Sequence, residues 1–193
     1  MSQFSENICL FDAKGRRKYL NHKERQDFYY ASYGLSIEEQ LFCQILFWTG
    51  VRISEAINLQ VDQIDFSECH ITINTLKKRE KTVFRQIPIP ETYCSVLKEY
   101  ITTTDKANQI WSKSRRTYSR YIKKRMRNIG INGPQGSAKG LRHSFAVNCV
   151  SKNIPLTLLQ KWMGHASINT TAIYLNIIGT EEREFAQRIW EDP

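Results

Sequence analysis

Apolar residues recur at helical spacing over most of this chain and alternate with polar residues in only one short stretch. The longest apolar run covers residues 41–48, follows Ser36 and Glu39, and stops before Gly50. A serine with a glutamate three residues later is typical of a capped helix start, and a glycine is typical of a helix end. The pattern therefore predicts a buried helix between residues 36 and 50.

The same spacing predicts most of the remaining elements. Helices are expected at 21–33, 54–59, 91–101, 114–129, 141–151, 156–163 and 170–177. Residues 70–74 alternate as a half-buried strand, and residues 83–89 return beside it after a charged turn. The sequence thus predicts a mainly α fold with a small antiparallel β-sheet, of the α+β class. Trp48, Phe145 and Trp162 are expected in the core.

Length sets the domain organisation. The 193 residues, 41% of them hydrophobic, are enough for one core and too few for a second full domain. We expect a basic N-terminal arm at 1–19, a single domain at 20–178 and a C-terminal tail at 179–193. The arm is interpreted as flexible, with an ordered docking segment as the alternative. No apolar run approaches the ~18 residues that a membrane span needs, and no secretion signal opens the chain, so a cytoplasmic protein is expected.

Cysteine and histidine spacing argues against a metal site. The five cysteines are scattered and never form C-x-x-C, and the four histidines show no H-E-x-x-H spacing. We therefore expect reduced thiols and no metal or other cofactor.

Charge is divided unevenly along the chain. Residues 1–105 carry 13 Lys and Arg against 14 acidic residues, whereas residues 106–180 carry 13 basic residues and no acid. Ordinary protein surfaces mix the two signs, so an acid-free segment of this length indicates a polyanionic partner such as nucleic acid. Within it, one face of the helix at 114–129 is expected to contact DNA through Arg115, Arg116, Arg120, Lys123, Lys124 and Arg127.

Three separated segments carry residues suited to phosphodiester chemistry through a tyrosine. TGVRISE (residues 49–55) contains Arg52, GLRHSFA (140–146) contains Arg142, and His165 precedes Tyr174 by nine residues. Planar guanidinium groups can hold phosphate oxygens in two-point contacts, and a tyrosine oxygen can replace one phosphodiester bond with another. Each residue alone is more often a surface or packing residue, but their joint order favours an active site.

These segments resemble the boxes of the tyrosine recombinases, or phage-type integrases. The resemblance covers about residues 20–178 and implies the tyrosine-recombinase catalytic-domain fold. It implies that Arg52 and Arg142 stabilise the phosphate, that His165 hydrogen-bonds a phosphate oxygen and that Tyr174 is the nucleophile. Glu55 would orient neighbouring groups.

Two lysines complete the implied site and depart from the family pattern. Lys77 would protonate the leaving 5′ oxygen, with Lys78 as the neighbouring candidate, because the hairpin here is longer than the usual compact version. Lys139 stands where the family's second box usually has histidine, and we expect it to act mainly through its charge. His143 is expected to be structural.

The resemblance implies a metal- and ATP-independent, site-specific DNA recombinase or integrase that forms a covalent 3′-phosphotyrosine. Its partners would be double-stranded DNA and, as a homo-tetramer on paired DNA sites, three further copies of itself, with accessory DNA-binding proteins as an additional expectation. The tail at 179–193 would dock on the next protomer. A type IB topoisomerase, which shares this chemistry, and a catalytically silent DNA-binding regulator are the alternatives.

Overall fold

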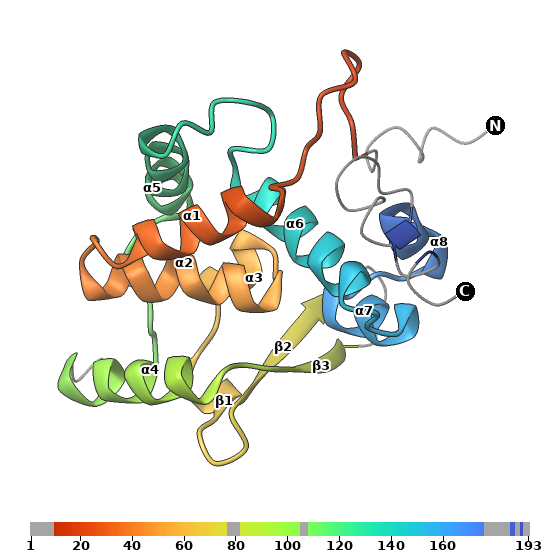
Figure 1. Cartoon of the computed structure of the whole chain (residues 1–193). Coiled ribbons are helices and arrows are strands. Elements are labelled where there is room, and N and C mark those ends of the chain that lie inside the picture. The colour runs from red at the N-terminus through yellow and green to blue at the C-terminus, as the bar shows by residue number, and fades with distance from the viewer. Residues whose placement is uncertain (1–9, 77–81, 105–107, 176–185, 188–189, 191–193) are drawn as a thin grey trace.

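Helices make up most of the computed structural model, which describes residues 10–76, 82–104, 108–175, 186–187 and 190. A small sheet lies at one side of the helices (Figure 1). The helices are α1 (His22–Ser32), α2 (Ile37–Thr49), α3 (Ile53–Ile57), α4 (Glu91–Thr104), α5 (Arg115–Asn128), α6 (Ala138–Ser151), α7 (Leu156–Met163) and α8 (Ile168–Ala172), with 3-10 turns η2 (Val61–Gln63) and η3 (Ile173–Leu175). The predicted mainly α fold with a small sheet is confirmed.

The sheet has three antiparallel strands in the order β1-β2-β3. They are β1 (Ile64–Asp65), β2 (His70–Leu76) and β3 (Thr82–Pro88). The register pairs Ile71 with Ile87 and Ile73 with Arg85. Arg85 is therefore the buried cross-strand neighbour of a buried isoleucine. The predicted turn at 77–81 lies outside the described residues.

Helix ends follow the expected local chemistry in two places and depart from it in one. Asn21 caps α1 with a capping box to Glu24, and Gly50 ends α2 in the left-handed conformation with φ 61°. Ser36 precedes α2, but its side chain makes no capping hydrogen bond, so the predicted capping box there is wrong. Packing stabilises α2 without this capping box, since nearly every residue from Leu41 to Thr49 is buried.

The larger core lies where α2 contacts α1, α4 and α5. The rings of Phe42 and Tyr118 stack there with centroids 3.7 Å apart, and Trp111 meets Phe42 edge-on. On α5 the predicted division holds: Tyr118, Ile122 and Met126 are buried, while the six basic residues expected to contact DNA are exposed. The predicted packing side of α5 is therefore confirmed.

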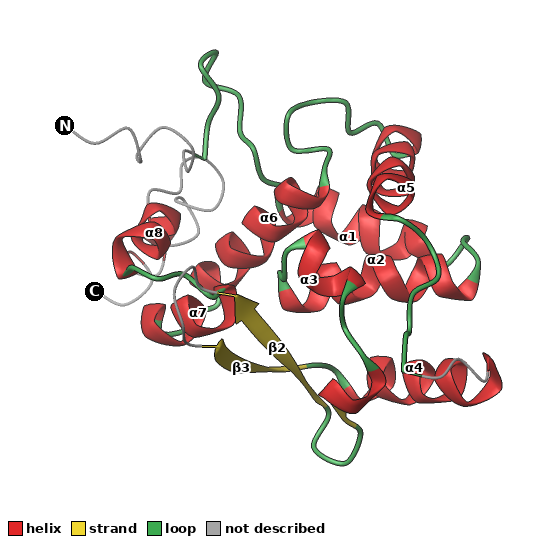
Figure 2. Cartoon of the chain, turned by 180° about the vertical axis from the view of Figure 1, so that it is seen from behind, coloured by secondary structure: helices red, strands yellow, loops and turns green. Residues whose placement is uncertain are grey.

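A second core joins the N-terminal segment to α6, α7 and η3. Leu10 and Tyr19 are 3% and 1% exposed and pack with Phe145, Met163 and Tyr174. Residues 10–19 therefore form a docked segment, which agrees with the alternative interpretation of the arm; residues 1–9 lie outside the described part of the chain. Seen from behind, the segment projects as a loop between α6 and the chain end (Figure 2). Trp48 and Trp162 are only half-buried, against the core.

Candidate active site

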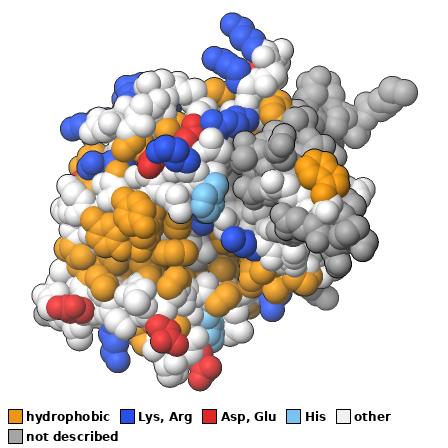
Figure 3. Space-filling model, viewed as in Figure 1, with side chains coloured by type: hydrophobic (Ala, Val, Ile, Leu, Met, Phe, Trp, Pro, Cys, Tyr) orange, Lys and Arg blue, Asp and Glu red, His pale blue; other side chains and the backbone are white. Residues whose placement is uncertain are grey.

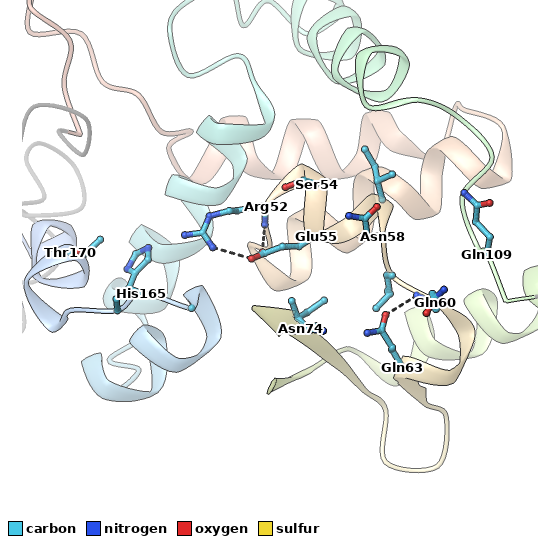
Figure 4. A pocket seen from close by; sticks show the side chains of 15 residues that line it. Arg52, Ser54, Glu55, Asn58, Gln60, Gln63, Asn74, Gln109, His165 and Thr170 are labelled. Carbon is cyan, nitrogen blue, oxygen red and sulfur yellow. Dashed lines mark hydrogen bonds and ion pairs between the residues drawn. The ribbon is translucent and has the colours of Figure 1, made fainter. Parts of the chain in front are cut away.

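The first arginine of the site owes its position to the end of α2. The left-handed Gly50 reverses the chain, and a Cβ there would lie 2.3 Å from the Phe145 ring, so only glycine fits. Arg52 follows as the N-cap of α3 and binds Glu55 one turn later, with Nη1 3.0 Å from Oε1. The Arg52 backbone N–H also donates to Glu55 Oε2 at 2.8 Å. This bracing turns the half-exposed guanidinium toward the groove (Figure 4).

A second arginine, Arg85 on β3, binds the same carboxylate. Its side chain is 3% exposed, donates from Nη2 to Glu55 Oε2 at 2.7 Å and from Nε to the Trp162 carbonyl at 2.9 Å. Burial alone would raise the pKa of Glu55, but Arg85 and the contacts from Arg52 hold it below its ordinary value. Glu55 is therefore a carboxylate that links α3 to β3, and Arg85 in turn links β3 to α7.

The sequence analysis missed Arg85, although the signal was present. In the run from Val83 to Ile87, alternation places Arg85 on the same face as Ile87, while Phe84 and Gln86 are exposed. A basic residue on the inward face of a strand needs a buried acceptor, and Glu55 is that acceptor.

Arg142 lies deeper than Arg52 and is fixed by backbone rather than by an acid. It is 8% exposed, and its Nη1 and Nη2 donate to the carbonyls of Gly50 at 2.7 Å and Met163 at 2.5 Å. These bonds join the end of α2 and the end of α7 through one side chain of α6. Burial, reinforced by the nearby Arg52, lowers its pKa to about 10, so the group stays charged at neutral pH.

His165 follows the left-handed Gly164, which ends α7 with φ 61°. Its Nδ1 lies 2.9 Å from Thr171 Oγ1, and its ring is nearly parallel to that of Tyr174, with an interplanar angle of 10° and centroids 6.3 Å apart. Burial and the charges of Arg142 and Arg52 lower its pKa to about 3, so the imidazole is neutral. A neutral ring can hydrogen-bond a phosphate without adding charge.

Tyr174 is 1% exposed, and its hydroxyl lies 2.9 Å from Nδ1 of His143. Burial raises the pKa of Tyr174 to about 12, although Arg142 and Arg52 pull it down. Burial, followed by the charges of Lys139 and Arg142, lowers the pKa of His143 to about 4. His143 was expected to be structural, and the structure brings it into direct contact with the candidate nucleophile.

These side chains line one cavity of about 360 Å³. Its walls include Arg52, Ser54, Arg115, Lys139, Arg142, His143, His165, Thr170 and Tyr174. A wider groove of about 930 Å³ shares Arg52, Ser54, His165 and Thr170 with it and continues past the carboxamides of Asn58, Gln60, Gln63, Asn74 and Gln109 (Figure 4). Positive charge therefore marks one end of the groove and neutral amides the other.

The structure brings together five predicted site residues at this cavity, namely Arg52, Lys139, Arg142, His165 and Tyr174, with Glu55 bonded to Arg52. Lys77 and Lys78 lie outside the described residues. Of the six basic residues on α5, Arg115 also lines the cavity. In the described part of the chain, no group of three or more His, Cys, Asp or Glu could hold a metal ion. No helix there is long and apolar enough to cross a membrane.

Chemically, the cavity combines an anion site with a hydroxyl nucleophile. Arg52, Arg142 and Lys139 supply three positive charges at or beside it, and Tyr174 supplies the oxygen. Guanidinium groups suit a planar array of phosphate oxygens better than a point charge does. The arrangement is suited to attack by tyrosine on a phosphodiester.

Comparison with known proteins agrees with this geometry. Residues 18–179 match the phage integrase family. The chain is 31% identical over 162 residues to tyrosine recombinase XerA of Pyrococcus furiosus, covering 79% of this chain and 54% of that protein. It is 29% identical to tyrosine recombinase XerH of Campylobacter jejuni, covering 82% and 45%. The chain thus spans about half the length of the curated relatives it matches.

Solved structures share the fold. The crystal structure of XerA recombinase superposes with a TM-score of 0.75 at 23% identity, covering 91% of this chain and 65% of the other. XerH site-specific recombinase bound to difH substrate, in a pre-cleavage complex, gives a TM-score of 0.74 at 21% identity, covering 93% and 59%.

Proposed function

Because the chain belongs to the phage integrase family, we propose that it is a site-specific DNA recombinase that cleaves and rejoins DNA through Tyr174. The observation that carries the proposal is the cavity in which Tyr174, Arg52 and Arg142 meet. Neither a buried tyrosine nor a buried arginine is informative alone. Their convergence from α3, α6 and η3 is hard to explain by packing, because none of the described residues that line the cavity is an acid that could pair with its cations.

In the proposed reaction the Tyr174 oxygen attacks the phosphorus atom of a DNA strand. The bond from this oxygen to phosphorus forms while the bond from phosphorus to the 5′ oxygen breaks, which gives a 3′-phosphotyrosine and a free 5′ hydroxyl. Arg52 and Arg142 hold the non-bridging oxygens as charge develops on them. The phosphodiester energy is conserved in the protein-DNA bond, so a second 5′ end can be joined without ATP.

The resting site is not yet ready for this step. Burial raises the pKa of Tyr174 and lowers the pKa of His143, so transfer of the hydroxyl proton to the imidazole is opposed in the resting structure. His143 therefore holds the Tyr174 hydroxyl in place and is not its base in this arrangement. DNA must change the surroundings of Tyr174 before attack. The Tyr174 proton then passes to solvent, and Lys139, the cation beside His143, would stabilise the negative charge that develops on the tyrosine oxygen.

By resemblance, Lys77 donates the proton that the leaving 5′ oxygen takes up, with Lys78 as the alternative. Both belong to the segment between β2 and β3, outside the described residues. A substrate with sulfur at the 5′-bridging position leaves without a proton, so it should rescue Lys77→Ala selectively. Rescue of Lys78→Ala, with Lys77→Ala barely impaired, would exchange their roles.

Exchange between two DNA sites requires two duplexes, and we propose four copies of this chain on them. Residues 179–193, acidic and apolar by turns, are the proposed docking segment for the next protomer. Accessory DNA-binding proteins remain an additional expectation. Acting on DNA would place the protein at the nucleoid or on a plasmid.

Incubation with duplexes that carry a nick near the cleavage point tests the proposal, because the cut fragment diffuses away and traps the adduct. We expect a protein-DNA adduct with the native chain, with or without EDTA, and none with Tyr174→Phe, which should still bind DNA. An adduct in Tyr174→Phe would assign the nucleophile elsewhere. Binding without any adduct would favour the silent regulator, and relaxation of supercoils without exchange between two sites would favour the topoisomerase.

A further inference from the structure

Residues 10–18 form a tight hairpin that the active site does not use. Phe11 and Arg17 pair as an antiparallel bridge, and the Lys18 N–H donates to the Leu10 carbonyl at 2.7 Å. Inside the turn, Asp12 Oδ1 accepts from the backbone N–H groups of Lys14 and Arg16, each at 2.9 Å. Gly15 closes the turn with φ 71° and donates to the Asp12 carbonyl at 3.0 Å. The hairpin is therefore held in one conformation by its own hydrogen bonds.

Buried residues at both ends fix the hairpin to the body of the protein. Leu10 and Tyr19 sit in the second core, and the segment between them projects outward (Figure 1). In the space-filling view, basic side chains stand out at the same position at the top, and separate basic side chains lie over α5 at the upper left (Figure 3). A rigid projection loses little conformational entropy when it binds a partner.

Two of the four cations of the hairpin are already paired. Arg16 contacts Asp12 at 2.8 Å, and Arg17 forms a forked pair with Glu24 at the start of α1. Lys14 is exposed at the tip, and Lys18 lies on the returning arm. Neither lysine has an acidic partner within the described ranges of the chain. The paired arginines shape the hairpin, and the two lysines are left to meet a ligand.

The base of the hairpin lies near the catalytic cavity. Glu24, which binds Arg17, also accepts a hydrogen bond from Gln135 at 3.2 Å, and Gln135 lies in the loop between α5 and α6. On the cavity wall, the pKa of His143 is lowered by burial, and the positive charges of Lys139 and Lys18 both contribute to the lowered pKa. The hairpin is therefore tied through Glu24 to the start of α1 and to the loop between α5 and α6.

We propose that the hairpin at residues 10–18 binds the phosphate backbone of duplex DNA beside the catalytic cavity, through Lys14 and Lys18. This inference rests on the proposed recombinase function. Duplex DNA is favoured over a membrane because Ala13 and Gly15 at the tip offer no apolar side chain large enough to insert. It is favoured over an acidic peptide because Lys18 lies near the cavity that Arg52, Arg115, Lys139 and Arg142 line, so one continuous polyanion could contact both the hairpin and the cavity.

The test measures affinity for a duplex without any recombination site as a function of salt concentration. Lys14→Ala and Lys18→Ala should each make the slope of log affinity against log salt shallower by about 0.9. Lys14→Glu should weaken binding further than Lys14→Ala. Lys98→Ala, an exposed lysine on the distant α4, is the matched control and should leave the slope unchanged. Circular dichroism and thermal unfolding confirm that each variant keeps the fold.

The outcomes separate this inference from the proposed function. A native chain that binds duplexes and forms the Tyr174 adduct, with slopes unchanged in both lysine variants, would overturn the hairpin contact and leave the recombinase standing. A native chain that binds no duplex at any salt concentration would overturn both. Loss of affinity for vesicles of anionic lipid, with duplex binding unchanged, would assign the hairpin to a membrane surface instead.

Discussion

The two sides of the catalytic cavity are built from opposite chemistry. On the side of α3 and β3, Arg52, Glu55 and Arg85 form a charged network, and Arg142 joins it from α6. On the side of η3, Tyr174 and His143 meet through a hydrogen bond between uncharged groups, and the neutral His165 lies alongside. One side carries three arginines against one carboxylate, whereas Tyr174, His143 and His165 on the other are uncharged at neutral pH, with Lys139 as the cation beside His143.

This difference means that the phosphate-binding arginines are already in place, whereas the surroundings of Tyr174 must change before it can react. Arg142 is fixed by two carbonyls, Arg85 by a carbonyl and a carboxylate, and Arg52 by Glu55, so the anion site exists before any anion arrives. The tyrosine is buried, protonated and turned toward a histidine that cannot take its proton. We therefore expect the arginines to bind the DNA phosphate first, and Tyr174 to react only after DNA binding has changed its surroundings.

The largest expected effect comes from removing Arg85, which should break the charged side alone. Arg85→Met leaves Glu55 buried with only the half-exposed Arg52 as its charged partner, and should lower the free energy of unfolding by about 3 to 5 kcal/mol. Denaturant titration measures the loss. Arg17→Met, which breaks the more exposed pair with Glu24, is the matched control and should cost about 1 kcal/mol or less.

The double variant Glu55→Gln with Arg85→Met tests the cause. If the penalty arises from an uncompensated carboxylate, the double variant should be more stable than Arg85→Met alone. Equal stability of the two would mean that the bond from Arg85 to Trp162 carries the effect. Arg85 would then be a brace for α7 and not a partner of Glu55.

The next effect distinguishes the two arginines that face the phosphate. Arg142→Ala and Arg52→Ala should each raise the barrier to cleavage by about 3 kcal/mol, more than a hundredfold in rate. Only Arg142→Ala should also destabilise the fold, by about 1 to 3 kcal/mol, because it leaves the Gly50 and Met163 carbonyls without their donor. Cleavage rates on nicked DNA and denaturant titration give the two quantities. Near-normal cleavage by either variant would place the phosphate elsewhere.

The sequence predicted one side of this comparison better than the other. Arg52, Arg142, His165 and Tyr174 were found because each stands at a helix end or in a short motif, where local chemistry fixes the backbone. The contact between His143 and Tyr174 joins residues 31 positions apart and depends on how η3 packs against α6, which no local pattern encodes.

Two further misses have the same physical origin. Arg85 was not predicted because the sequence of a short strand does not show which of its two faces is buried, and a charged residue is usually on the exposed face. Residues 10–19 were read as an arm because Leu10 and Tyr19 show no period, although both are buried against α6 and α7. Long-range packing decides both, and tertiary contacts override local propensity there.

The two sides of the cavity should lose stability at different pH values as the solution is acidified. The pKa of His143 is about 4 when folded and about 6.5 when unfolded, so between these values the unfolded chain binds the proton and the native chain does not. Stability should therefore be constant above pH 6.5 and fall as pH drops toward 4, by up to about 3 kcal/mol from His143. His165 acts in the same direction. The pKa of Glu55 is lowered, so the loss from the charged side begins only below about pH 4.5.

Denaturant titration between pH 7 and pH 4.5 checks this order. His143→Asn should flatten the loss of stability in that window, while His22→Asn, at an exposed position of α1, serves as the control. An unchanged pH dependence in His143→Asn would show that folding does not lower the pKa of His143. The effect of burial on the Tyr174 side of the cavity would then be wrong.

The smallest effect per residue concerns charge outside the cavity, where α5 should bind DNA without entering the chemistry. Arg120, Lys123 and Lys124 are exposed, and the opposite face of α5 holds the helix to the core through Tyr118 and Ile122, so Ala at all three positions should leave the fold intact. Affinity for every duplex should fall, and the slope against log salt should become shallower by about 0.9 per lost phosphate contact. The cleavage rate at saturating DNA should be unchanged, since none of the three lines the cavity. A loss confined to one DNA sequence, with the slope unchanged, would mean that these side chains read base edges, and α5 would then supply specificity while the hairpin and the cavity supplied the phosphate contacts.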